Sequence, residues 1–426
     1  MKKKILTILL SSAMIFSMGI STVSAAAADD TASTESIVVS KTEGITDTTY
    51  GKVRGFIDDG TYTFRGIPYA KADRFEMPEA PDSWDGIRNC LVYGSTAPIT
   101  KMTDPDGGDF IIPHRYWAQS ENCQNLNVWT QDLDTNAKKP VMVWFHGGGY
   151  TNGSSIEGVA YDGKNLSEYG DVVVVTVNHR LNVLGYLDVS EYGEDYQYSG
   201  NCGTADMIAS LQWVKENIAN FGGDPDNVTI FGQSGGGGKV ISMLASPEAE
   251  GLFNQAIVQS GSERYIEKDT AKKITEKTLE ILGITDNQIE QLKEVPYDIL
   301  DAAATEAMKQ VGEELGTSLS WRPVLDEDYI QSNFQEWTND VPVMVGSVFG
   351  EMNCWTALDP NETNKNSWTD EEVDAKLTEK YGDKAEAVKE AFLKAYPEKS
   401  ACDAYYVSNR TGDFGTLAKR LESGDN

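Results

Sequence analysis

The chain has 426 residues, of which 40% are hydrophobic, and 66 acidic against 36 basic residues give it a formal net charge of -30. That length and apolar content are sufficient for a sizeable buried core. Because nucleic acids and anionic membrane surfaces repel a strongly acidic protein, the charge argues against both as partners.

The N-terminal segment has the pattern of a secretory signal peptide. Three lysines at 2–4 precede an apolar run over 5–20 and a stretch of small residues over 21–28. The run is too short to span a bilayer, and a small-residue cleavage site follows it directly. We expect a signal peptide over 1–25 with cleavage at 25–28, a disordered leader over 26–36, and an exported, extracellular protein.

The cysteines and histidines predict neither a disulfide scaffold nor a metal site. The five cysteines are widely spaced, and their odd number leaves at least one free thiol in an exported protein. One bridge, such as Cys90 to Cys123, is compatible with the sequence, which does not fix the pairing. Three isolated histidines do not form a zinc site, and the acidic run over 104–109 is more typical of a surface turn than of a calcium loop. We expect no metal and no cofactor.

Strand and helix patterns along the chain predict an α/β fold. A hairpin is expected over 50–67, around the Asp-Asp-Gly turn at 58–60. Four short β-rich runs follow, at 125–130, 141–145, 172–178 and 228–231. The last three are nearly all apolar, as is typical of buried parallel strands. Apolar residues over 204–221 recur at helical spacing. This alternation indicates a doubly wound, mostly parallel sheet with right-handed crossovers.

The second half of the chain is expected to be mainly helical. A charged helical stretch over 268–312 lies within a predicted helical cap at about 263–340, which would cover the sheet. A further strand over 341–348 leads into Glu351. Three helices are expected after it, at 370–381, 384–396 and 411–421.

Ser234 is the candidate nucleophile. It lies in Gly232-Gln-Ser234-Gly-Gly236, between the apolar strand at 228–231 and an apolar helix at 240–245. A serine on such a sharp strand-to-helix turn exposes its hydroxyl at the carboxyl end of the sheet, and flanking glycines permit the close backbone approach. The alternative, a flexible glycine-rich loop, fits poorly because strand and helix bracket the glycines so closely.

A second glycine run, His146-Gly-Gly-Gly149, follows the strand at 141–145. Backbone N–H groups in such a run can converge on one point and stabilise a tetrahedral oxyanion together with the N–H of Gly235. The alternative is an ordinary tight turn.

With both glycine runs in place, the chain resembles the type B carboxylesterases, the α/β-hydrolases that include p-nitrobenzyl esterases and cholinesterases. The resemblance covers nearly everything from Tyr50 to Asn426. It rests on the segments FRGIPYA at 64–70, SENCQNLNV at 120–128, HGGG at 146–149, VNHR at 177–180, GNCG at 200–203, WVKENI at 213–218, FGGDP at 221–225, QSG at 259–261 and WRPVLD at 321–326.

The resemblance assigns roles to five residues. It implies that Ser234 is the nucleophile, that Glu351 is the acid of the triad, and that the oxyanion donors are Gly148, Gly149 and Gly235. It also implies two structural ion pairs, Arg74 with Glu121 and Arg180 with Asp206. The implied substrate is a small carboxylic ester.

The chain departs from the family pattern at three points. Gln233 replaces the usual glutamate before the nucleophile, which weakens any inference toward cationic substrates, and Gly235 replaces the usual alanine. The third departure is the catalytic histidine, because no histidine follows His179. We therefore expect a carboxylesterase sequence that lacks its C-terminal part and is nearly inactive as given.

Two other functions fit the sequence less well than an esterase does. A non-catalytic, cholinesterase-like binding module would dispense with the nucleophile, the oxyanion run and the acid, yet all three are present. A nucleotide-binding P-loop ending at Lys239 fails because its glycines are spaced one residue too far apart and Val240 replaces the required Ser or Thr. The oligomeric state is not predictable.

Overall fold

The computed structural model describes residues 37–99, 114–262, 264–351 and 368–406. The predicted signal peptide, leader, acidic run at 104–109 and helix at 411–421 all lie outside these residues. None of the helices described has the length and apolar character needed to cross a membrane.

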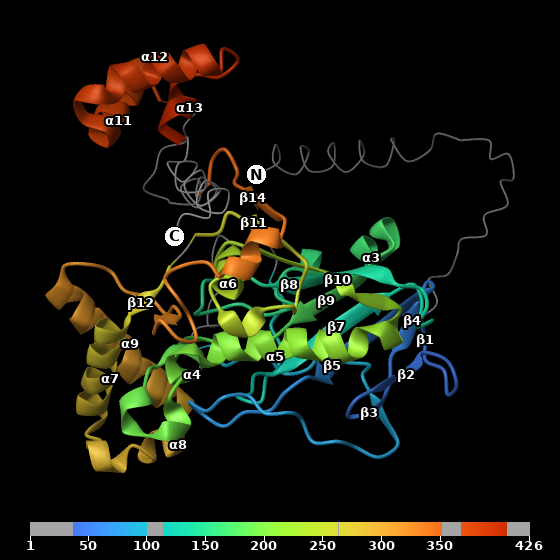
Figure 1. Ribbon diagram of the computed structural model, residues 1–426. Helices are drawn as coiled ribbons and strands as arrows, with labels where there is room; N and C mark the ends of the chain where they lie inside the picture. The colour runs from blue at the N-terminus through green and yellow to red at the C-terminus, as the bar shows by residue number, and fades with distance from the viewer. Residues whose placement is uncertain (1–36, 100–113, 263, 352–367, 407–426) are drawn as a thin grey trace, which may run out of the picture. The chain divides into compact units, whose positions relative to one another are not determined.

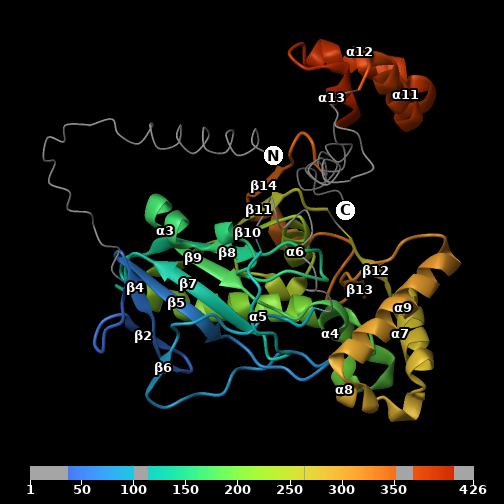
Figure 2. The same cartoon turned by 180° about the vertical axis from the view of Figure 1, so that it is seen from behind.

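The described strands form one large mixed sheet and two small ones (Figures 1 and 2). The large sheet has the order β1-β4-β5-β7-β9-β8-β10-β11-β14, and the small sheets are β2-β3-β6 and β12-β13. The strand bounds are β1 Ile37–Val38, β2 Ile45–Thr48, β3 Gly51–Arg54, β4 Phe56–Asp58, β5 Thr61–Pro68, β6 Ile87–Asn89, β7 Asn125–Thr130, β8 Lys139–Phe145, β9 Val173–Val177, β10 Gly223–Gln233, β11 Gln255–Gln259, β12 Ile266–Glu267, β13 Val324–Leu325 and β14 Val343–Gly346.

The N-terminal hairpin is confirmed, although its first strand is divided. β4 pairs with β5 in antiparallel register, whereas β3, just upstream, pairs with β2 in a separate sheet. Asp59 and Gly60 close the turn with φ values of 51° and 91°. Two residues at positive φ match the right-handed twist of the flanking strands, which is why this turn tolerates so short a connection.

The predicted parallel strands form the centre of the large sheet. β9, β8, β10, β11 and β14 pair in parallel, in that order, so their carboxyl ends meet along one edge. β11 had no counterpart among the predicted strands. β14 lies at the end of the sheet order, and its outward-facing Met344 is 66% exposed.

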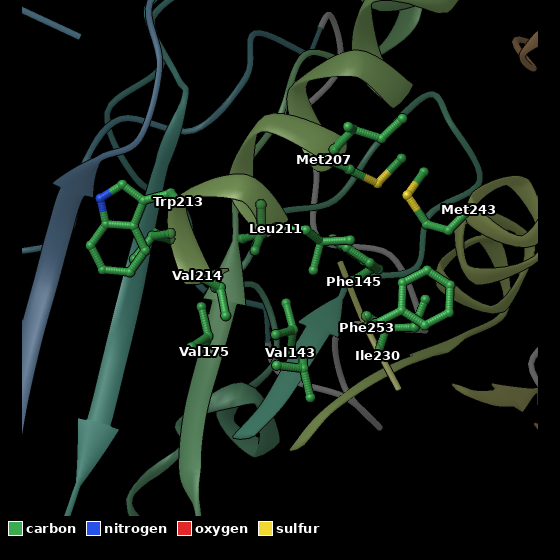
Figure 3. Close-up of a cluster of buried hydrophobic side chains, with 14 of the residues drawn as sticks. Val143, Phe145, Val175, Met207, Leu211, Trp213, Val214, Ile230, Met243 and Phe253 are labelled. Atoms are coloured by element: carbon green, nitrogen blue, oxygen red, sulfur yellow. The ribbon is translucent and has the colours of Figure 1, made fainter. Parts of the chain in front are cut away.

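Helices cover both faces of this sheet, as alternating side chains on β9 show. Val173 and Val175 belong to the main core with residues of α5 (Cys202–Asn217), whereas Val174 packs with Leu166 of α3 (Lys164–Gly170). Figure 3 shows Val214 and Leu211 of α5 directed toward strand residues such as Val175 and Val143. Helix α6 (Gly235–Leu244) packs beside α5 on β8, β10 and β11.

The helical segments of the second half form two further groups. α7 (Lys268–Leu282), α8 (Gln291–Glu294) and α9 (Tyr297–Leu315) share a hydrophobic cluster with α4 (Asn182–Tyr186). α11 (Asp370–Tyr381), α12 (Ala385–Ala395) and α13 (Ala401–Tyr406) surround a small core of their own. The predicted helices at 370–381 and 384–396 are therefore confirmed to within a residue.

Both predicted ion pairs form. Arg74 Nε donates to Glu121 Oε2 at 2.6 Å, and Arg180 contacts both carboxylate oxygens of Asp206 at 2.7 and 2.9 Å. The Arg180 and Asp206 side chains are only 3% and 0% exposed. Arg180 also donates to the carbonyl oxygens of Asp73 and Glu76, so this pair joins the loop over 73–76 to the core.

A bridge between Cys90 and Cys123 does not form, and that option is wrong. Both residues are buried free thiols that belong to different hydrophobic clusters. Burial raises the pKa of Cys90 to about 12 and also raises the pKa of Cys123, which disfavours the reactive thiolate form of both.

Asp206→Ala should lower the free energy of unfolding by about 3–5 kcal/mol, because it leaves the buried Arg180 charge without a partner. The matched control is Lys215→Ala, which breaks the solvent-exposed Lys215–Asp226 pair and should cost less than about 1 kcal/mol. Urea unfolding followed by tryptophan fluorescence measures both. Equal losses would show that the Arg180–Asp206 pair does not stabilise the core.

Candidate active site

Ser234 lies between the end of β10 at Gln233 and the start of α6 at Gly235. Its φ of 57° and ψ of -122° are values that residues other than glycine rarely adopt. Its N–H donates to the carbonyl of Gln259 on β11 at 2.8 Å, and its own carbonyl accepts from the N–H of Gly238 at 3.1 Å. The side chain is exposed. This is the geometry of a strained strand-to-helix turn that presents a serine hydroxyl above a sheet.

The glycines after Ser234 allow two backbones to touch. A Cβ added to Gly235 would lie 2.4 Å from the backbone nitrogen of Gly149, and one added to Gly236 would lie 2.1 Å from the carbonyl oxygen of Phe145. Neither position has room for a methyl group. The alanine that is usual at position 235 in the family therefore does not fit this chain, whose oxyanion run packs directly against the start of α6.

The oxyanion run itself is a tight turn. Gly148 and Gly149 have φ values of 85° and 66°, and the carbonyl of Gly148 accepts from the N–H groups of Thr151 and Asn152. Positive φ at both positions is a conformation that glycine adopts without steric cost. The turn thus places Gly149 beside Gly235, the two predicted oxyanion donors that meet here.

Ser234 opens into a cavity of about 160 Å³. Gly149 and Gly235 line it with Ser234, so the structure brings together the predicted nucleophile and two predicted oxyanion donors. The other lining residues are Tyr150, Thr151, Gly238, Ser260, Ser262, Arg264, Ser320, Trp321 and Arg322. The cavity walls come largely from residues to which sequence reasoning gave no role.

Glu351 follows β14, at the same edge of the sheet as Ser234, but it does not line this cavity. Its Oε1 accepts a hydrogen bond from the N–H of Val348 at 3.1 Å, which closes a local turn. Gly148 does not line the cavity either. The role of Glu351 as the acid therefore stays a prediction, as does that of Gly148 as a donor.

All three histidines of the sequence lie among the described residues, and none of them hydrogen-bonds Ser234 there. The rings of His146 and His179 are buried and stack on each other with centroids 4.9 Å apart. Burial, with the neighbouring charge of Lys239, lowers the pKa of both rings well below the usual value, so both are neutral. His114 Nδ1 lies 3.6 Å from Glu157 Oε1, and its backbone forms an isolated bridge to Gly158.

Lys239 is a buried lysine whose position the sequence motif did not reveal. It lies on α6 with its side chain fully buried, and its Nζ donates to the carbonyl of His146 at 2.8 Å. That carbonyl begins the oxyanion run. Burial lowers the pKa of Lys239 to about 7. Lys239 therefore ties the helix that follows Ser234 to the loop that carries the predicted oxyanion donors.

Comparison with known proteins places this geometry in a family. The sequence profile of the carboxylesterase family matches residues 42–415, so the chain belongs to that family. The para-nitrobenzyl esterase of Bacillus subtilis is 37% identical over 73% of this chain and 63% of its own length. Phenmedipham hydrolase of Pseudarthrobacter oxydans is 32% identical over 82% of this chain and 69% of its own length.

Solved structures confirm the α/β-hydrolase fold. An esterase of Clostridium hathewayi that can hydrolyze aliphatic aromatic polyesters is 42% identical, covers 91% of this chain and 78% of its own, and superposes with a TM-score of 0.82. The carboxylesterase EST55 of Geobacillus stearothermophilus has 33% identity and a TM-score of 0.67 over 90% of this chain and 76% of its own. The chain spans less than two thirds of the para-nitrobenzyl esterase that it matches.

Gly235→Ala should lower the free energy of unfolding by about 1–3 kcal/mol, because its methyl group must displace Gly149. Gly346→Ala is the matched control, since a Cβ there meets nothing within 4 Å, and its effect should stay within about 0.5 kcal/mol. Thermal unfolding compares the two. A neutral Gly235→Ala would mean that the loop and helix are not in contact.

Between about pH 7 and 10, the free energy of unfolding of the wild-type protein should rise with pH more steeply than that of Lys239→Met. The reason is that the folded-state pKa of Lys239, about 7, lies below the unfolded value of about 10.4, so the unfolded chain binds more protons in this window. Below pH 7 the difference should level off. Urea unfolding at a series of pH values measures it, and parallel curves for the two proteins would contradict a depressed pKa.

Proposed function

We propose that this protein is a serine carboxylesterase that attacks carboxylic esters with Ser234. The observation that carries the proposal is the single cavity in which the strained Ser234 lies beside the backbones of Gly149 and Gly235. Family membership and the esterases among the similar proteins support the reaction class.

The proposed reaction follows from these positions. The Ser234 Oγ attacks the ester carbonyl carbon and loses its proton, and the carbonyl oxygen becomes an oxyanion that the N–H groups of Gly149 and Gly235 stabilise. Each such donor typically stabilises the transition state by about 3 kcal/mol. Collapse of the intermediate breaks the bond to the alcohol, which takes up a proton and leaves an acyl-enzyme. Water then hydrolyses the acyl-enzyme to the free acid and regenerates Ser234.

The reaction needs a base for the Ser234 proton, and none of the three histidines contacts that hydroxyl. Removing the histidine of a well-studied serine protease cost about a million-fold in turnover. We propose that Glu351 acts as the acid of the triad where a histidine is supplied, and that this chain as given turns over esters very slowly. The second candidate is a non-catalytic binding module of the same fold.

We also propose that the protein is exported, on the strength of the signal-peptide pattern at 1–28. Expression in a secreting host should yield a mature protein in the medium whose N-terminus lies at residues 26–29. Retention of residue 1 in the cell-associated protein would contradict export.

Prolonged incubation with excess fluorophosphonate should form a covalent adduct on Ser234. The reaction should be slow because no histidine contacts the hydroxyl, whereas the oxyanion donors and the exposed position of that hydroxyl favour attack on phosphorus. Intact-mass and peptide mass spectrometry locate the adduct. Ser234→Ala should abolish it, and Ser83→Ala, a change at an exposed loop serine that does not line the cavity, should leave it unchanged.

Hydrolysis of 4-nitrophenyl butyrate, measured in the same samples, separates the two candidates. Slow turnover that disappears in Ser234→Ala supports the esterase. Absence of both labelling and turnover supports the binding module and contradicts the proposal.

A further inference from the structure

Two arginines line the cavity that contains Ser234, and the fold places them side by side. Arg264 precedes β12 and Arg322 precedes β13, which pair in parallel with Ile266 opposite Val324. Each arginine thus lies two residues before a paired position. The register of this small sheet, together with the hydrogen bond from the Ile266 N–H to the Pro323 carbonyl at 2.9 Å, brings the two guanidinium groups to one wall.

The two side chains are oriented in the same way. Arg264 Nε donates to Ser262 Oγ at 2.8 Å, and Arg322 Nε donates to Ser320 Oγ at 3.3 Å. In both cases the acceptor is the serine two residues earlier. Within the described part of the chain, the Nη atoms of both arginines have no hydrogen-bond acceptor. Each serine therefore orients a guanidinium while its two outer nitrogens stay available for a ligand.

This arrangement is electrostatically unusual for so acidic a chain. Of the carboxylates that the structure describes, none pairs with Arg264 or Arg322, whereas Arg74 and Arg180 each contact one. Burial and the adjacent charge of Arg264 lower the pKa of Arg322. Two like charges beside each other in a partly closed cavity repel, and a bound anion would relieve that repulsion.

We propose that the cavity selects short esters that carry an anionic oxygen group, a carboxylate or a phosphate, which the Nη atoms of Arg264 and Arg322 bind while the ester carbonyl lies at Ser234. This inference rests on the proposed function of the same cavity. Guanidinium groups match both anions because they present paired N–H donors. The cavity of about 160 Å³ is comparable in volume to a void that holds one benzene ring, so it accommodates a short ester.

Equilibrium binding tests the anion site without requiring turnover. Isothermal titration calorimetry with monoethyl glutarate should give a Kd at least about tenfold lower than with ethyl pentanoate, its neutral counterpart of equal chain length. Inorganic phosphate is the second anionic probe, and its Kd relative to that of monoethyl glutarate identifies the preferred anion. Added salt should weaken the binding of both anionic ligands and leave the binding of ethyl pentanoate unaffected.

Variants assign the effect to the two arginines. Arg264→Gln, Arg322→Gln and the double variant should each raise the Kd of monoethyl glutarate, by at least about tenfold for the double variant. Arg264→Lys should retain part of the affinity, because it keeps the charge without the paired donors. Arg88→Gln, an exposed arginine on β6, is the matched control and should bind as the wild type does. Circular dichroism confirms that each variant is folded.

The outcomes distinguish this inference from the proposed function. Fluorophosphonate labelling of Ser234 without anion binding would overturn the anion site and leave the esterase intact. Anion binding that depends on the arginines without labelling would support the site and contradict the esterase. Equal affinity for monoethyl glutarate and ethyl pentanoate, or an unchanged Kd in the double variant, overturns the inference.

Discussion

The site depends on one close contact, the approach of the first turn of α6 to the ends of the neighbouring strands. Gly235 touches the backbone of Gly149, and Gly236 touches the carbonyl of Phe145. This contact leaves Ser234 in a strained conformation and places the oxyanion run beside it. Because backbone rather than side chain fills the space, a larger residue has no room there, and the packing of α6 against β10 and β11 offsets the strain at Ser234.

Basic side chains in and beneath the cavity distinguish this site from the acidic exterior of the protein. Lys239 lies under the oxyanion run without a paired carboxylate among the described residues, and Arg264 and Arg322 face the cavity above it. Lys239 acts on the loop through the carbonyl of His146, whereas the arginines act on a ligand through free donors. Lys239 thus holds the loop in position, and the proposed role of the two arginines is to select the substrate.

The sequence predicted the features that depend on local pattern. Strands such as Asn125–Thr130, the helix Asp370–Tyr381 and the Ser234 turn each follow from hydrophobic runs or from glycines at fixed spacing. It did not predict β11 (Gln255–Gln259), whose short run with a glutamine at each end has no clear period. Nor did it predict the pairing of Arg264 with Arg322, because that depends on the register of two strands far apart in the chain. The burial of Lys239 also depends on tertiary packing. A single lysine at the start of the apolar sequence Lys239–Leu244 is nevertheless a signal from which its burial could have been predicted.

The central claim is that the Ser234 turn and the oxyanion run form one preorganised unit. A crystal structure of the phosphonylated protein tests it most directly. The account predicts a phosphoryl oxygen about 2.7–3.1 Å from the backbone nitrogens of Gly149 and Gly235, with the backbone of both unchanged. A phosphoryl oxygen directed away from these two N–H groups, or a rearranged loop over 147–149, would contradict it.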